Sequence, residues 1–181
     1  MKFFLIHGAP ATGKLTVARE LASLTGLPLV DNHAAIDMAR MVFGFAQPGF
    51  WDLVHDLRVT TLHGASRAHV SGLITTAAYS HPEDALLLRD YDHALEEHGG
   101  VIEPIHLFCA EDTLMERVSG SERAKKGKIS SPEGLRCYLD RNNFVAIPRS
   151  NCLSLSTENT TPLEVAAAIA KHFQIPVVSG E

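Results

Sequence analysis

Short apolar runs alternate with longer amphipathic stretches along the whole chain. The apolar runs predict buried strands at 2–6, 27–30, 72–78, 101–109 and 152–156. The stretches between them predict helices at 14–25, 34–43, 51–70, 82–98, 112–118, 133–143 and 162–173. Because strands and helices alternate, the pattern indicates an α/β fold, a three-layer sandwich around a five-stranded, mostly parallel sheet.

Composition narrows the class of protein. A chain of 181 residues with 45% hydrophobic side chains suits a single domain spanning 1–181. The net charge of −5 argues against a nucleic-acid partner. No stretch approaches the roughly 20 apolar residues of a membrane span, and the first apolar run ends at His7, short of a secretory signal. We expect a monomer or homodimer that acts on small molecules.

The spacing of the cysteines and histidines does not predict a metal site. Cys109, Cys137 and Cys152 are odd in number and lie at no metal-ligand spacing, which predicts reduced thiols in a cytoplasmic protein. The histidines also show no metal-ligand spacing, so the sequence predicts no zinc site.

A glycine-rich segment joins the first predicted strand to the first predicted helix. It has the Walker A pattern, and its residues are Gly8, Ala9, Pro10, Ala11, Thr12, Gly13 and Lys14, followed by Leu15 and Thr16. In such a P-loop the glycines let backbone N–H groups face phosphate oxygens, and the helix N-terminus adds its positive dipole end. Lys14 would bring a full charge to the β- and γ-phosphates, so the segment predicts ATP binding.

Two positions depart from the usual P-loop enzyme. The hydroxyl that normally follows the lysine and binds Mg²⁺ is replaced by Leu15, and Thr16 supplies a hydroxyl one residue later. The third predicted strand ends in Thr75 and Thr76 and lacks the Walker B aspartate. Thr16 and Asp31 are therefore the candidates to bind Mg²⁺.

With this P-loop the chain resembles the P-loop kinases that include adenylate and shikimate kinases. Within that group it most resembles the small uncharacterised kinases and the tunicamycin-resistance-type P-loop proteins. Two further segments carry the resemblance: 114–117 followed by Arg123, and 156–159. The resemblance implies a nucleoside-monophosphate-kinase-like fold with a mobile lid over 118–131. It also implies that Arg117 lies near the adenine, that Arg123 reaches the phosphates, and that the backbone around Thr157 wraps the adenine. Either arginine could instead be a plain surface residue.

Polar residues after the second predicted strand form a candidate acceptor site. Asp31, Asn32 and His33 follow that strand, and ligands of open α/β sheets collect at such carboxyl ends. Asp31 could orient an acceptor hydroxyl, or it could simply cap the next helix. His33 could contact substrate or be structural.

Other candidate acceptor contacts lie further along the chain. Asp37 and Arg40 belong to a stretch similar to one in adenylate kinases whose arginine grips the acceptor phosphate, although Arg40 could be a surface residue. Thr75 and Thr76 could bind a polar acceptor or serve only as strand formers. Trp51 could line the site or anchor its helix.

Two functional hypotheses follow. The first is an ATP-dependent phosphotransferase acting on a small hydroxyl- or phosphate-bearing molecule, with Lys14, Arg123 and Asp31 as catalytic residues. The second, motivated by the missing Walker B aspartate, is an ATP-binding resistance or regulatory protein that sequesters a small ligand. A GTPase is disfavoured because 106–112 lack an Asn-Lys-x-Asp signature.

Overall fold

A computed structural model describes residues 1–119 and 128–178. Five parallel strands form one sheet in the order β2-β3-β1-β4-β5. Their bounds are β1 Lys2–His7, β2 Leu29–Val30, β3 Gly72–Ala77, β4 Val101–Phe108 and β5 Leu153–Ser156. The helices are α1 Lys14–Thr25, α2 Asn32–Arg40, α3 Phe50–Arg67, α4 Ala85–Glu96, α5 Glu111–Val118, α7 Pro132–Leu139 and α8 Pro162–His172. The predicted α/β sandwich is confirmed.

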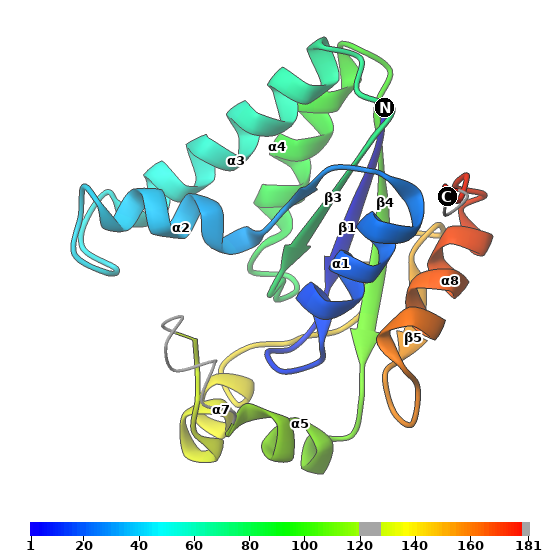
Figure 1. Ribbon diagram of the computed structural model, residues 1–181. Helices are drawn as coiled ribbons and strands as arrows, with labels where there is room; N and C mark the ends of the chain where they lie inside the picture. Colours follow the sequence, from blue (N-terminus) through cyan, green and yellow to red (C-terminus); the bar gives the residue numbers. More distant parts are fainter. Residues whose placement is uncertain (120–127, 179–181) are drawn as a thin grey trace.

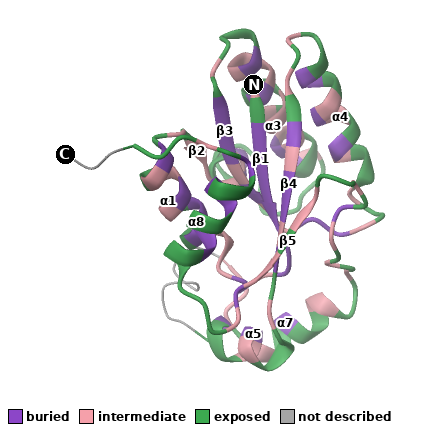
Figure 2. Ribbon diagram, turned by 90° about the vertical axis from the view of Figure 1, so that its right-hand side faces the viewer, coloured by how far each residue is buried: buried purple, intermediate pink, exposed green. Residues whose placement is uncertain are grey.

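The helices cover both faces of the sheet (Figure 1). Alternate residues of β1 face opposite sides, as a pleated strand requires. Phe4 and Ile6 are buried in the core beneath α1 and α8, while Phe3 and Leu5 join the core beneath α3 and α4. Figure 2 shows the result, with buried residues concentrated on the central strands and exposed residues on the outer surfaces of the helices.

The element boundaries follow local backbone chemistry. Helix α1 begins and ends at the predicted residues because left-handed Gly13 and Gly26 flank it. Strand β2 begins two residues later than predicted, since Pro28 has no N–H to donate to the sheet. Helix α4 begins at Ala85 rather than at position 82, because residues 81–84 form a turn.

A smaller cluster lies at the carboxyl ends of the strands. Ala9 and Ala11 of the glycine-rich loop pack there against Leu114, Val118 and Leu135 of α5 and α7. Helices α5 and α7 thus support the loop from outside the sheet (Figure 1). Within the described residues, no helix is long and apolar enough to cross a bilayer.

Candidate active site

The loop between β1 and α1 has a tightly curled backbone that depends on glycine at two positions. Gly8 has φ 137°, and a Cβ added there would lie 2.1 Å from the carbonyl oxygen of Leu107 in β4. Gly13 has φ 88° and stands directly before the first turn of α1. Both positions require glycine, the first through close backbone approach and the second through its left-handed conformation.

Side chains of the loop hold this conformation. The buried Thr12 hydroxyl donates to the Ala9 carbonyl at 2.9 Å. The Lys14 ammonium donates to the carbonyls of Gly8 and Ala9 at 2.9 and 2.6 Å. The positive charge of Lys14 is therefore centred on the loop, at the N-terminus of α1, which favours an anionic ligand.

A neutral histidine lies at the base of the loop. His7, the last residue of β1, is fully buried, and its ring stacks on that of His106 with centroids 5.2 Å apart. Burial lowers the pKa of His7 to about 3, and the nearby His106 and Lys14 act in the same direction. At neutral pH the ring is therefore uncharged and does not compete with Lys14 for an anion.

An open cleft of about 660 Å³ extends from the loop across the carboxyl edge of the sheet. The structure brings together there residues that are far apart in the sequence. The predicted site residues that line the cleft are Pro10, Ala11, Gly13, Lys14, Leu15, Thr16, Asp31, Asn32, His33, Arg40 and Thr76. Trp51 also lines it and is half exposed, so its ring forms part of the cleft wall.

Of the two roles that the sequence left open for Asp31, the structure shows the helix cap, and it also places the residue in the cleft. Its carboxylate caps α2 by accepting from the His33 backbone N–H at 3.3 Å, and it lies 3.4 Å from Nδ1 of the same residue. Burial acts to raise the pKa of Asp31, but the contacts with His33, together with Lys128, lower it to about 2. The cleft therefore holds an ionised carboxylate near the P-loop at neutral pH.

The remaining predicted acceptor residues differ in position. Arg40 lines the cleft, donates to the exposed Asp37 at 3.3 Å and lies over the Phe45 ring. Asp37 does not line the cleft, so it supports Arg40 from outside. The Thr75 hydroxyl donates to the Val30 carbonyl at 2.8 Å and ties β3 to β2.

A second group of predicted residues lies beside β5. The Arg117 guanidinium donates to the hydroxyl of Thr157 at 3.1 Å and to its carbonyl at 2.9 Å. Glu158 accepts from the backbone of Ala110 and from the hydroxyl of Thr113. These bonds fasten the segment after β5 to both ends of α5, Arg117 from its last turn and Ala110 and Thr113 from its start. Arg123 and residues 120–127 of the predicted lid lie outside the described residues.

Comparison with solved structures finds the same architecture in several kinases and in a tunicamycin resistance protein. A sugar kinase from a Janibacter species superposes with a TM-score of 0.67 at 18% identity, covering 97% of this chain and 95% of that one. A tunicamycin resistance protein from Deinococcus radiodurans gives 0.62 at 16% identity, covering 99% of both chains. Shikimate kinase from Acinetobacter baumannii, in complex with shikimate, gives 0.59 at 17% identity, covering 96% and 92%.

The chain has the fold of the P-loop small-molecule kinases. The predicted resemblance is thus confirmed at the level of fold. No protein-family model matches the sequence, and comparison with curated proteins finds no match. In this fold the glycine-rich loop and the cleft border one continuous space.

Arg58 also lines the cleft, although the sequence did not mark it as a candidate site residue. Its side chain comes from the middle of α3 and borders both the main cleft and a smaller cavity beneath it. Burial lowers the pKa of Arg58, while Tyr91 and Asp84 act to raise it. Its buried Nε has no hydrogen-bond partner among the described residues. No local motif marks Arg58; the only signal was its position in an otherwise amphipathic helix.

The donor atoms of the cleft fit Mg²⁺. The exposed Thr16 hydroxyl and the ionised Asp31 carboxylate border the same space, and hard oxygen ligands are the ones that Mg²⁺ prefers. Asp84 adds a second carboxylate to the cleft wall, although its Oδ2 already accepts from the Ser80 backbone at 2.7 Å.

Proposed function

We propose that this protein is an ATP-dependent phosphotransferase that phosphorylates a small acceptor carrying a hydroxyl and an anionic group. The observation that carries the proposal is a P-loop, with Lys14 at its centre, opening into a cleft that also contains Asp31 and Arg58. Phosphoryl transfer depends on positioning and on neutralising the charge of the transferred group, and these residues supply both.

Each residue has a stated task in this mechanism. Lys14 and the loop N–H groups bind the β- and γ-phosphates and stabilise the charge on the transferred group. Asp31 holds the acceptor hydroxyl in line and accepts its hydrogen bond. Thr16 and Asp31 would hold Mg²⁺, which when bound supplies additional positive charge next to the phosphates. We also propose that Arg117 and Thr157 form the adenine end of the site and that Arg123, on a lid over 118–131, assists Lys14.

The charges of the cleft favour an anionic acceptor. Arg58 and Arg40 come from different helices and border the same cleft. A buried guanidinium edge without a partner carries a desolvation cost, which a carboxylate or phosphate would offset through charge-assisted hydrogen bonds. The shikimate kinase of similar fold is bound to an acid of this kind. Asn32, His33 and Thr76 would contact the polar groups of the acceptor.

The experiment is a product screen with matched acceptors. The protein is incubated with Mg²⁺ and ATP and with hydroxy acids, sugar acids and nucleoside monophosphates, each paired with a neutral ester, amide or nucleoside. Mass spectrometry detects the phosphorylated product. We expect a product from an anionic acceptor, little or none from its neutral partner, and none with Lys14→Ala. Preference for the neutral member of every productive pair would contradict the anionic-acceptor assignment while leaving the kinase assignment intact.

One observation favours a second candidate function. Strand β3 ends in Thr76 and Ala77 without a carboxylate, so among the described residues the cleft takes its carboxylates only from Asp31 and Asp84. A protein with this site could bind ATP and an acidic ligand without efficient transfer, as a resistance or regulatory protein would. Tight binding of ATP by the wild-type protein without any phosphorylated product would favour this function.

A further inference from the structure

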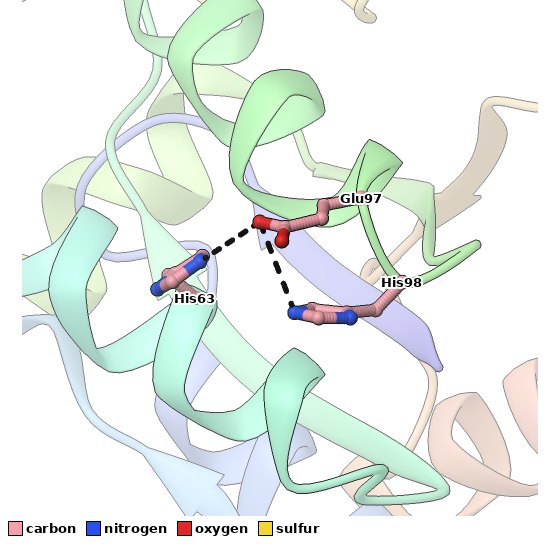
Figure 3. A group of neighbouring side chains, drawn as sticks. All are labelled: His63, Glu97 and His98. Carbon is pink, nitrogen blue, oxygen red and sulfur yellow. Dashed lines mark hydrogen bonds and ion pairs between the residues drawn. The ribbon is translucent and has the colours of Figure 1, made fainter.

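We propose that His63, Glu97 and His98 form a binding site for a transition-metal cation such as Zn²⁺, at the opposite end of the sheet from the cleft. One ligand atom from each residue lies within 4.8 Å of the other two. His63 Nε2 is 3.4 Å from Glu97 Oε2, and His98 Nε2 is 4.0 Å from the same oxygen. Figure 3 shows both rings turning a nitrogen toward this carboxylate.

The distances suit a tetrahedral ion after a small contraction. Bonds of about 2.0–2.1 Å in tetrahedral geometry place ligand atoms about 3.3 Å from one another. The His63–Glu97 pair is already near that spacing at 3.4 Å. The His98–Glu97 pair, at 4.0 Å, must shorten by about 0.7 Å, and the two ring nitrogens, which lie within 4.8 Å of each other, must also approach. Two imidazoles and one carboxylate are a known set of protein ligands for Zn²⁺, with the fourth position left to water.

His98 shows that hydrogen bonds within the protein do not already satisfy the cluster. Its Nε2 is buried and has no hydrogen-bond partner among the described residues, because the Glu97 carboxylate is too far away for a hydrogen bond. A buried polar nitrogen without a partner is uncommon and costly. An ion bonded to this nitrogen would remove that cost and would bridge the imidazole to Glu97 and His63.

The backbone around the cluster is well defined. Glu97 and His98 lie in the turn that ends α4, where left-handed Gly99 donates to the Glu96 carbonyl and Gly100 donates to that of Leu95. His63 lies in the last turns of α3, which ends at Arg67. The C-terminal ends of α3 and α4 lie near one another at the top of Figure 1. The cluster lies in or next to these last turns, and the negative end of a helix dipole favours a cation.

The site would act as a clamp between α3 and α4. The same two helices are already linked at another point without a metal, because His55 Nε2 of α3 lies 3.1 Å from a carboxylate oxygen of Asp90 in α4. An ion at the cluster would fix the far end of α3, the helix that carries Trp51 and Arg58 into the cleft. The sequence missed the cluster because residue 63 is separated by 34 positions from its nearest partner.

The test uses the untagged full chain, so that no affinity tag binds metal. Zn²⁺ affinity and stoichiometry are measured by titration, and Co²⁺ serves as a spectroscopic probe of geometry. The variants are His63→Ala, His98→Ala, the double variant and Glu97→Gln. The matched control is His55→Ala, which removes a histidine from the same helix pair outside the cluster. Circular dichroism checks that each variant is folded.

We expect one Zn²⁺ per chain, an intense tetrahedral Co²⁺ spectrum, and a melting temperature that rises with Zn²⁺. Each cluster variant should weaken Zn²⁺ binding at least about tenfold, while His55→Ala stays within about twofold of wild type. An octahedral Co²⁺ spectrum in the wild-type protein would overturn the proposal without any substitution. Equal Zn²⁺ affinity in the double variant would also overturn it, since binding would then lie at other histidines or at the thiols.

Discussion

The two walls of the cleft are built in different ways. The P-loop wall is one continuous segment, in which backbone conformation and the Lys14 ammonium would form the proposed anion site. The acceptor wall is assembled from side chains of α2, α3 and β3, which only the tertiary fold brings together. We infer that the P-loop wall is sensitive to backbone changes, and that the acceptor wall is sensitive to changes of side-chain charge.

The largest effect on stability and ATP binding is expected at Gly8, where the P-loop backbone lies closest to β4. Gly8→Ala would force a Cβ against the Leu107 carbonyl at a backbone angle that alanine rarely adopts. We expect a loss of about 3 kcal/mol or more in the free energy of unfolding, together with loss of ATP binding. Urea denaturation and ATP titration measure both. Wild-type stability in this variant would show that the loop backbone is not held against β4.

On the acceptor wall, we expect acceptor binding to depend more on the charge of Arg58 than on the volume of its side chain. Arg58→Met keeps much of the side-chain volume but removes a partly unpartnered guanidinium. We expect the KM for the acceptor to rise at least about tenfold, or about 1.4 kcal/mol, with the KM for ATP unchanged. Thermal stability should stay equal or rise, because a buried charge is removed.

Arg58→Lys keeps the positive charge but removes the planar guanidinium, so in the same assay it separates the effect of charge from that of hydrogen-bond geometry. It should recover only part of the acceptor affinity, since an ammonium cannot form the paired hydrogen bonds of a guanidinium. A large loss of stability in Arg58→Met with an unchanged KM for the acceptor would make Arg58 a structural residue.

A smaller effect is expected at Asp31, which lies between the two walls. Its pKa falls from an ordinary 3.8 to about 2 in the folded protein, so its ionised form stabilises the fold above about pH 4. That contribution is lost as the pH falls toward 2. Asp31→Asn keeps a helix-capping oxygen but removes the charge, and should cost about 1 kcal/mol at pH 7 after allowance for solvent screening.

The pH dependence of this difference is the decisive observation. The stability difference between wild type and Asp31→Asn should shrink as the pH falls from about 4 toward 2 in urea denaturation. Asp37→Asn, at an exposed carboxylate on the same helix, is the matched control and should have little effect at any pH. A difference for Asp31→Asn that does not change with pH would contradict the ionised-carboxylate account.

The smallest expected effect is an increase in stability from a substitution in α3. Gly64 lies inside α3, and a Cβ added there meets no atom within 4 Å. Gly64→Ala should raise the free energy of unfolding by about 0.5–1 kcal/mol, because alanine restricts the unfolded chain and favours the helix. Paired with Gly8→Ala in the same denaturation assay, it tests whether the requirement for glycine is confined to the P-loop wall.

The same contrast explains what the sequence could predict. The P-loop and the bounds of α1 were predictable because Gly8, Gly13 and Lys14 lie close together in the sequence and their spacing encodes the backbone. The order of strands and helices followed from hydrophobic periodicity. Arg58 and the cluster of His63, Glu97 and His98 were not predictable, since their significance depends on which helices pack together. Thr75 and Thr76 are identical and adjacent, so the sequence alone could not distinguish them. In the structure the alternation of side chains along β3 turns Thr75 toward the Val30 carbonyl, while Thr76 lines the cleft.

We propose above all that the protein transfers a phosphoryl group from ATP, held by Lys14 and the P-loop, to an acceptor in the adjoining cleft. The most direct measurement is formation of phosphorylated product from ATP and Mg²⁺ across the acceptor panel, comparing wild type with Lys14→Ala at equal folded concentration. The account predicts a product from at least one anionic acceptor and a rate at least about 10³-fold lower in the variant. Equal product formation by Lys14→Ala would contradict it.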